Sequence, residues 1–152
     1  MTNRKTLALI ALFAAACSSG GGVGANIPKP KLQIIARTNL SEAAPSMATG
    51  INVHYEIEIT NNAQIPITLK RIDLDSMAGG GFELQSKTRQ FDVTIPPGDT
   101  RSVDFVTAAY IKDPTGNDAR TPVAVRAQAL FDSPEGKLQS IVQQRVSIFS
   151  GD

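Results

Sequence analysis

The segment Ile51-Asn52-Val53-His54-Tyr55-Glu56-Ile57-Glu58-Ile59-Thr60 alternates apolar and polar residues without interruption. Successive side chains of a β-strand point to opposite faces, so this pattern predicts a strand with one buried and one exposed face. A helix would scatter the five apolar residues around its circumference. The segment Asn61-Asn62-Ala63-Gln64 that follows predicts a turn into the next strand.

The next apolar residues predict a second strand with a change of phase. Ile67 and Leu69 share one parity, whereas Ile72 and Leu74 share the other. A β-bulge adds one residue to a strand and shifts its alternation. We therefore expect a bulge at residues 70–71 that keeps all four apolar side chains on the buried face.

Turn residues at 96–99 and 132–136 separate further short segments that have the composition of strands. These segments are residues 32–37, 82–85, 91–95, 101–107, 123–131 and 138–149. Seven or eight strands in residues 31–152 predict an all-β fold of two packed antiparallel sheets, an immunoglobulin-like or fibronectin III-like sandwich, with a closed barrel as the alternative. The chain has one Cys and no Trp, so it lacks the disulfide and core Trp of antibody domains.

Residues 1–16 have the three parts of a secretory signal peptide: the basic residues Arg4 and Lys5, a short apolar core, and small residues ending at Ala16. The apolar run is too short to span a membrane, which takes about 20 residues. With Cys17 at the cut and a Ser/Gly stretch after it, the segment resembles a bacterial lipoprotein signal. The resemblance implies cleavage between Ala16 and Cys17 and lipidation of Cys17. Ala14 replaces the Leu usual in that family, so ordinary cleavage and free secretion stay open as the alternative.

Residues 17–30 are predicted to tether the domain, because the Gly-rich part is flexible and Pro28 and Pro30 stiffen the approach to the first strand. The lipoprotein resemblance implies a membrane as partner, through the lipid on Cys17. Ser18 stands where inner-membrane members of the enteric class have Asp. We therefore expect the outer membrane, facing the periplasm, if the source is Gram-negative.

The charge of the mature chain argues against nucleic acid as a partner. Without Arg4 and Lys5, 13 of the 15 basic residues remain against 14 acidic residues. No stripe of Lys and Arg is available to neutralise phosphates. With the single Cys lipidated, no internal disulfide can form, and the core must stabilise the domain alone.

Residues 51–131 show a second, weaker resemblance. The runs 55–62, 65–69, 95–100 and 129–131 place an Asn-rich turn and Pro-Ile after a strand and an Ile-Pro turn later. In this they resemble the WHy (water-stress and hypersensitive-response) domain of late-embryogenesis-abundant proteins. The resemblance implies a sandwich fold, no catalytic residues, and a passive stress-protective role as an alternative function.

The residues that support catalysis or metal binding are few. His54 is the only histidine and has the polar parity of its strand, so we expect a surface residue, no zinc site and no Ser-His-Asp triad. Asp73 and Asp75 should share one strand face as a solvated pair. No catalytic residue and no cofactor are predicted.

Two loops are the candidate contact surfaces for a partner protein. Residues 109–121 form the longest predicted interruption and contain Asp113, Asn117 and Asp118, which are turn residues but also possible calcium ligands. Residues 76–81 contain Gly79, Gly80 and Gly81, which lack the Gly-Lys-Ser/Thr of a phosphate loop and predict a mobile hairpin tip. With no Trp and two Tyr, carbohydrate binding is not favoured. We expect a lipid-anchored envelope protein that binds another envelope protein. An envelope hydrolase with an unrecognised site is the enzymatic alternative.

Overall fold

The computed structural model describes residues 26–38, 50–77, 79–112 and 121–148. They form eight strands: β1 (Lys31–Ala36), β2 (Ile51–Thr60), β3 (Ile67–Ser76), β4 (Phe82–Leu84), β5 (Lys87–Ile95), β6 (Thr100–Ile111), β7 (Val123–Ser133) and β8 (Gly136–Val146). Every predicted strand is present. No described segment is a helix that could cross a bilayer.

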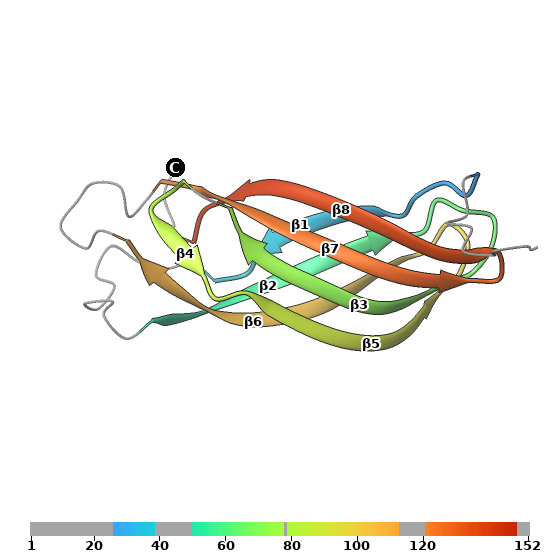
Figure 1. Cartoon of the computed structure of the whole chain (residues 1–152), viewed down its shortest axis with the longest axis horizontal. Coiled ribbons are helices and arrows are strands. Elements are labelled where there is room, and N and C mark those ends of the chain that lie inside the picture. Colours follow the sequence, from blue (N-terminus) through green and yellow to red (C-terminus); the bar gives the residue numbers. More distant parts are fainter. Residues whose placement is uncertain (1–25, 39–49, 78, 113–120, 149–152) are drawn as a thin grey trace, which may run out of the picture.

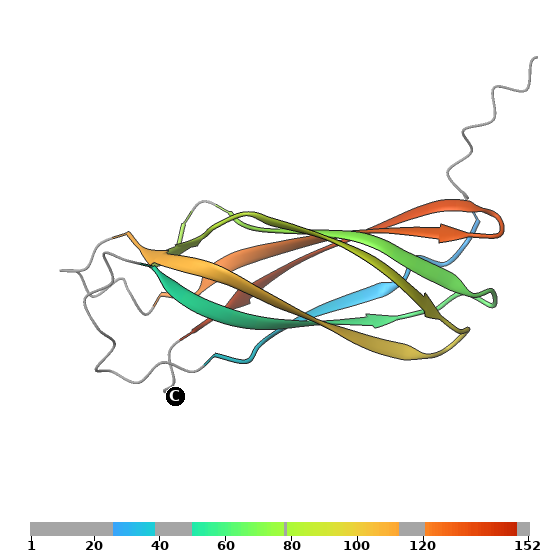
Figure 2. The same ribbon diagram turned by 90° about the horizontal axis from the view of Figure 1, so that it is seen from below.

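The strands form two antiparallel sheets that pack face to face. One sheet has the order β1-β2-β6-β4 and the other the order β5-β3-β7-β8. In Figure 2, β3, β7 and β8 lie in one layer and β1 and β2 in the other. The predicted two-sheet antiparallel sandwich is therefore confirmed.

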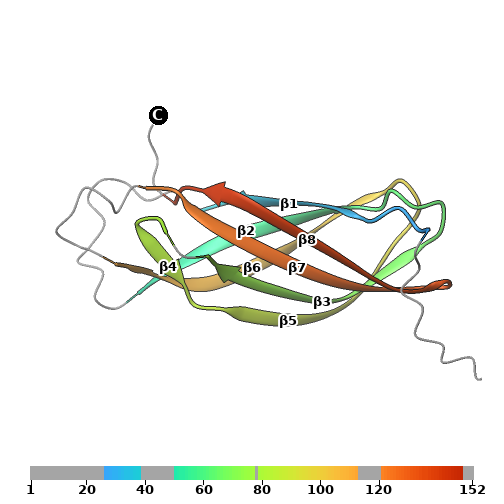
Figure 3. The same ribbon diagram turned by 45° about the horizontal axis from the view of Figure 1, so that its top comes forward.

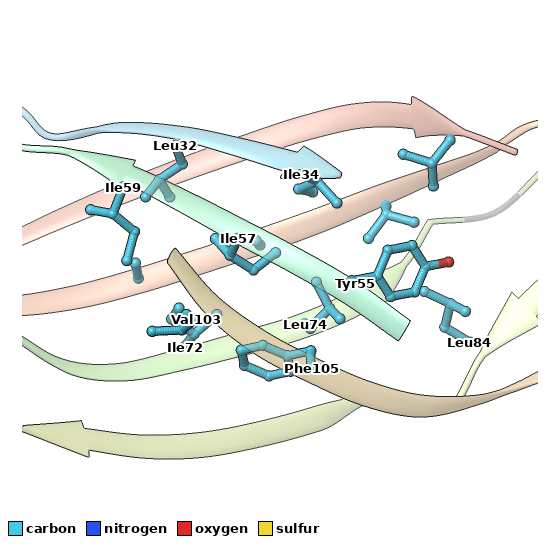
Figure 4. Close-up of a cluster of buried hydrophobic side chains, with 14 of the residues drawn as sticks. Leu32, Ile34, Tyr55, Ile57, Ile59, Ile72, Leu74, Leu84, Val103 and Phe105 are labelled. Atoms are coloured by element: carbon cyan, nitrogen blue, oxygen red, sulfur yellow. The ribbon is translucent and has the colours of Figure 1, made fainter. Parts of the chain in front are cut away.

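The core lies between the two sheets and follows the alternation of the sequence. On β2, Val53, Tyr55, Ile57 and Ile59 are fully buried. Figure 4 shows Tyr55, Ile57 and Ile59 among side chains of both layers, such as Leu74 on β3 and Phe105 on β6. Burial of apolar side chains stabilises the fold without any disulfide.

The predicted bulge in β3 is confirmed. The pairing of β3 with both β5 and β7 shifts between Leu69 and Arg71. Ile67, Leu69, Ile72 and Leu74 are all buried, as the phase change predicted. The extra residue keeps the apolar side chains of both halves of the strand on the core side.

Three strand boundaries differ from the sequence prediction by three residues or more, and the others by at most two. β5 begins at Lys87 rather than residue 91, and β8 ends at Val146 rather than residue 149. β6 continues to Ile111 instead of ending at 107, because residues 109–111 pair with β4. The predicted contact loop of residues 109–121 therefore begins later, at Lys112.

Most connections cross from one sheet to the other. β2 and β3, β3 and β4, and β5 and β6 each belong to different sheets, whereas β7 and β8 form a hairpin closed by Ser133 and Gly136.

The strands run along the long axis of the sandwich (Figure 1). We call the end with the start of β1 and the β7–β8 turn the near end. The far end contains the start of β2, the end of β6 and β4.

Asn61 joins the crossing connections of the near end. Its amide Nδ2 lies 2.9, 3.0 and 3.2 Å from the carbonyl oxygens of Ile65, Ile95 and Pro96, which share its two hydrogens. Its Oδ1 accepts a hydrogen bond from the N–H of Ala63 at 2.9 Å. The residue is 0 % exposed. One buried side chain therefore satisfies backbone groups of both the β2–β3 and the β5–β6 connections.

Candidate contact surface at the far end

The described residues of the two predicted contact loops meet at the far end of the sandwich. The N–H of Gly81 donates to the carbonyl of Thr121 at 3.1 Å, and the N–H of Lys112 donates to the carbonyl of Gly81 at 3.2 Å. Gly81 therefore bridges the residues on either side of segment 113–120. Asp113, Asn117 and Asp118 lie outside the described residues, as do Ala16 and Cys17.

The prediction of a hairpin tip at Gly79-Gly80-Gly81 is wrong. β3 and β4 lie in different sheets, so these glycines cross between the layers. Gly81 is buried, and a Cβ on Gly80 would lie 2.8 Å from the Cα of Val123. Turn residues identify a chain reversal but not the sheet that the next strand joins. Of the three glycines, Gly79 is the exposed one.

Two large apolar side chains are exposed at this end. Tyr110 is 43 % exposed near the end of β6, and Met77 is 38 % exposed after β3. The ring of Tyr110 lies over Gly50, whose Cβ would come within 2.8 Å of the ring atom Cε1. Gly50 has φ +75°, so its backbone also favours glycine. The sequence pattern predicted a loop at residues 109–121, so the place of Tyr110 on a paired strand was not expected.

The remaining candidate residues sit apart from this surface. His54 is exposed on the outer face of β2, as predicted. Asp73 and Asp75 share the outer face of β3, but each has a partner that the sequence did not indicate. Asp75 binds Arg126 through two hydrogen bonds, of 2.6 and 3.1 Å. Asp73 accepts a bond from the hydroxyl of Thr88 at 2.7 Å.

The pKa shifts come from exposed ion pairs and from one buried phenol. Bonds from Ser102 and Arg37 lower the pKa of Glu56. Asp92 raises the pKa of Lys70, and Asp75 raises that of Arg126. In each case the hydrogen bond favours the charged form of the group whose pKa it shifts. Within the described residues, no group of three or more His, Cys, Asp or Glu side chains is placed to hold a metal ion.

Tyr55 is the buried phenol, and desolvation raises its pKa. Its hydroxyl is buried without a hydrogen-bond partner among the described residues. Removing an unpaired buried hydroxyl removes a desolvation cost. We expect Tyr55→Phe to leave the free energy of unfolding unchanged or raise it by up to about 1 kcal/mol in urea unfolding. A clear loss of stability would mean that the hydroxyl has a partner after all.

Comparison with known proteins adds support for the fold. No protein-family model and no curated protein matches the chain. A solved structure described as Northeast Structural Genomics Consortium target SoR45 has a TM-score of 0.50 and 14 % identity, covering 78 % of this chain and 86 % of that one. A protein from Archaeoglobus fulgidus has a TM-score of 0.49 and 8 % identity, covering 80 % and 96 %. At such identities the first likeness indicates a shared fold only.

Proposed function

We propose that the chain is a lipid-anchored cell-envelope protein, held by a lipid on Cys17, and that its sandwich binds a partner protein at the far end without catalysis. The observation that supports this proposal most is that the chain enters the sandwich at the end opposite to the candidate contact loops. The chain enters the sandwich at the near end, through Asn26 to Pro30, while the described residues of both candidate contact loops meet at the far end. The ten residues of β2 alone separate the ends by about 30 Å.

This layout suits a module that is held at one end and makes contacts at the other. A lipid at Cys17 would hold the near end to the membrane and leave the far end free to make contacts. Tyr110 and Met77 supply the exposed apolar side chains that protein interfaces use as anchors. If the source is Gram-negative, Ser18 favours the outer membrane, with the domain in the periplasm.

Two measurements in cells test the proposal. Cys17→Ser should move the chain from the membrane fraction to the soluble envelope fraction. A photo-crosslinking residue at position 110 should give a discrete crosslinked protein, and the same residue at the exposed position of Asp99, in the near-end turn between β5 and β6, should not. Membrane retention of Cys17→Ser would contradict the anchor. Equal crosslinking from both positions, or none from position 110, would contradict far-end binding and favour the passive alternative.

A further inference from the structure

The edges of the two sheets differ in how their backbone groups are covered. The edge strands are β1 and β4 in one sheet and β5 and β8 in the other. Unpaired N–H and C=O groups of an edge strand are a template for a strand from another chain, and proteins block them with charges, side-chain bonds or covering segments. Comparing the edges therefore indicates where a strand could add.

The edge of β6 is blocked by cations of β5, and β5 itself has the charged residues Lys87, Arg89 and Asp92 along its own edge. β4 pairs only with the last residues of β6. Before that point, the carbonyl of Val106 accepts a hydrogen bond from the Lys87 ammonium at 2.7 Å, and that of Asp104 accepts one from the Arg89 guanidinium. Arg89 also lies 5.0 Å above the ring of Phe91, a cation–π contact that helps to hold it in place.

The edges of β4 and β1 are occupied by side chains of the opposite sheet. The N–H of Leu84 on β4 donates to the hydroxyl of Ser76 at 2.9 Å. The outward N–H of Ile34 on β1 donates to Oε1 of Gln144 at 3.1 Å. A strand that added at either edge would have to break these bonds.

The edge of β8 has no such cover within the described residues. Ser133 and Gly136 flank a two-residue turn as a hydrogen-bonded pair, and pairing with β7 continues without a shift. The odd-numbered residues from 137 to 145 therefore direct their N–H and C=O groups away from β7. The segment 138–144 contains no charge, Gly or Pro. Ile141 at its centre is 57 % exposed.

A groove of about 560 Å³ lies beside this edge, between β8 and the start of β1. The two strands run along the same side of the sandwich (Figure 3). Its lining includes the apolar side chains of Leu32, Leu138 and Val142, with Lys29 and Lys31 on the β1 side. Inward side chains of an added strand would find apolar contacts there.

Charge decides between a second copy of this chain and another partner. The exposed residues Lys137 and Arg145 flank the uncharged segment. Two β8 edges paired antiparallel about Ile141 would place Lys137 opposite Arg145 at both ends, and like charges directly opposite each other are destabilising. A partner strand with an acidic residue at each end would pair favourably at both.

We propose that the free edge of β8 binds an extended strand of another protein, one with alternating apolar residues between two acidic ends. This is strand addition, in which main-chain bonds give affinity and side-chain pockets give specificity. The site is separate from the far end and does not depend on a lipid anchor.

The test uses the full chain and an end-blocked peptide of nine residues. The peptide has Glu at both ends, Val at the even positions, and Thr at the odd positions between the ends. NMR titration should show shifts confined to β8 and the neighbouring start of β1. The same peptide with Lys at both ends should bind about tenfold more weakly, since two opposite-charge pairs become like-charge pairs. Lys137→Glu combined with Arg145→Glu should reverse this preference.

Ile141→Pro removes an outward N–H and no bond to β7, so it should weaken binding of the Glu peptide at least tenfold while circular dichroism shows the native fold. If this variant lost the fold, the charge-reversal pair would still test the site. Equal binding of the two peptides, shifts mapped to another surface, or dimerisation of the native chain through β8 would each overturn the proposal.

Discussion

Replacing Asn61 with alanine is expected to lower the free energy of unfolding by about 3 kcal/mol. The variant leaves the carbonyls of Ile65 and Ile95 and the N–H of Ala63 without the Asn61 side chain, which is itself fully buried. The carbonyl of Pro96 keeps the hydrogen bond from the N–H of Asp99. Each buried polar group left unpaired costs about 1–3 kcal/mol, and relaxation or water entry recovers part of that. For a domain of this size the midpoint of thermal unfolding should fall by about 10 °C.

The neighbouring residue supplies the control. Asn62 is exposed and donates one long hydrogen bond, 3.3 Å, to the carbonyl of Lys29. Asn62→Ala should therefore cost less than about 1 kcal/mol. Asn61→Asp keeps the acceptor for Ala63 but loses the donors, so it should be at least as damaging as Asn61→Ala. Equal, small effects at both positions would show that the corner does not depend on the Asn61 amide.

Gly80→Ala should be comparably destabilising, by about 3 kcal/mol, for a different reason. Gly80 has φ +92°, and its Cβ would lie 2.8 Å from the Cα of Val123 and 3.0 Å from the carbonyl oxygen of Pro122. Both of these atoms are backbone, so no side chain can rotate to make room. The substitution combines an unfavourable backbone conformation with a displacement of the start of β7.

Gly79→Ala separates the two contributions. Gly79 has φ +99° but no atom within 4 Å of its Cβ position, so alanine there should cost only the backbone strain, about 1–2 kcal/mol. Denaturant unfolding of the two variants measures the difference, which reports the clash with β7. If the two variants were equally stable, the close approach at Gly80 would not constrain the crossing.

The strands could be predicted because each buries one face, and burial imposes a period of two on the sequence. This is clearest for β2, whose boundaries match the prediction, and for the β3 bulge, where the phase change is visible in the residues themselves. The first half of β5 was missed because Lys87 to Gln90 are all exposed. A strand that buries neither face leaves no alternation to detect.

The assignment of strands to sheets could not be predicted in the same way. A turn sequence shows that the chain reverses, but Gly79 to Gly81 and Asn61 to Pro66 cross between layers rather than closing hairpins. The partner of Asp75 was invisible for a similar reason: Arg126 lies 51 residues away in sequence. Contacts between distant segments depend on which strands are neighbours, which local patterns do not contain.

The pairing of β1 with β2 has a mechanical consequence. Lys31 pairs with Thr60 at the near end and Ala36 with Tyr55 towards the far end. The segment that precedes β1 therefore joins it at the near end, where a pull acts along the strand. Interstrand hydrogen bonds are perpendicular to the strands. A pull on Asn26 against a load held at the far end would stress the bonds of this ladder together, in shear, instead of opening them one at a time. The sandwich is thus oriented to resist tension along its long axis.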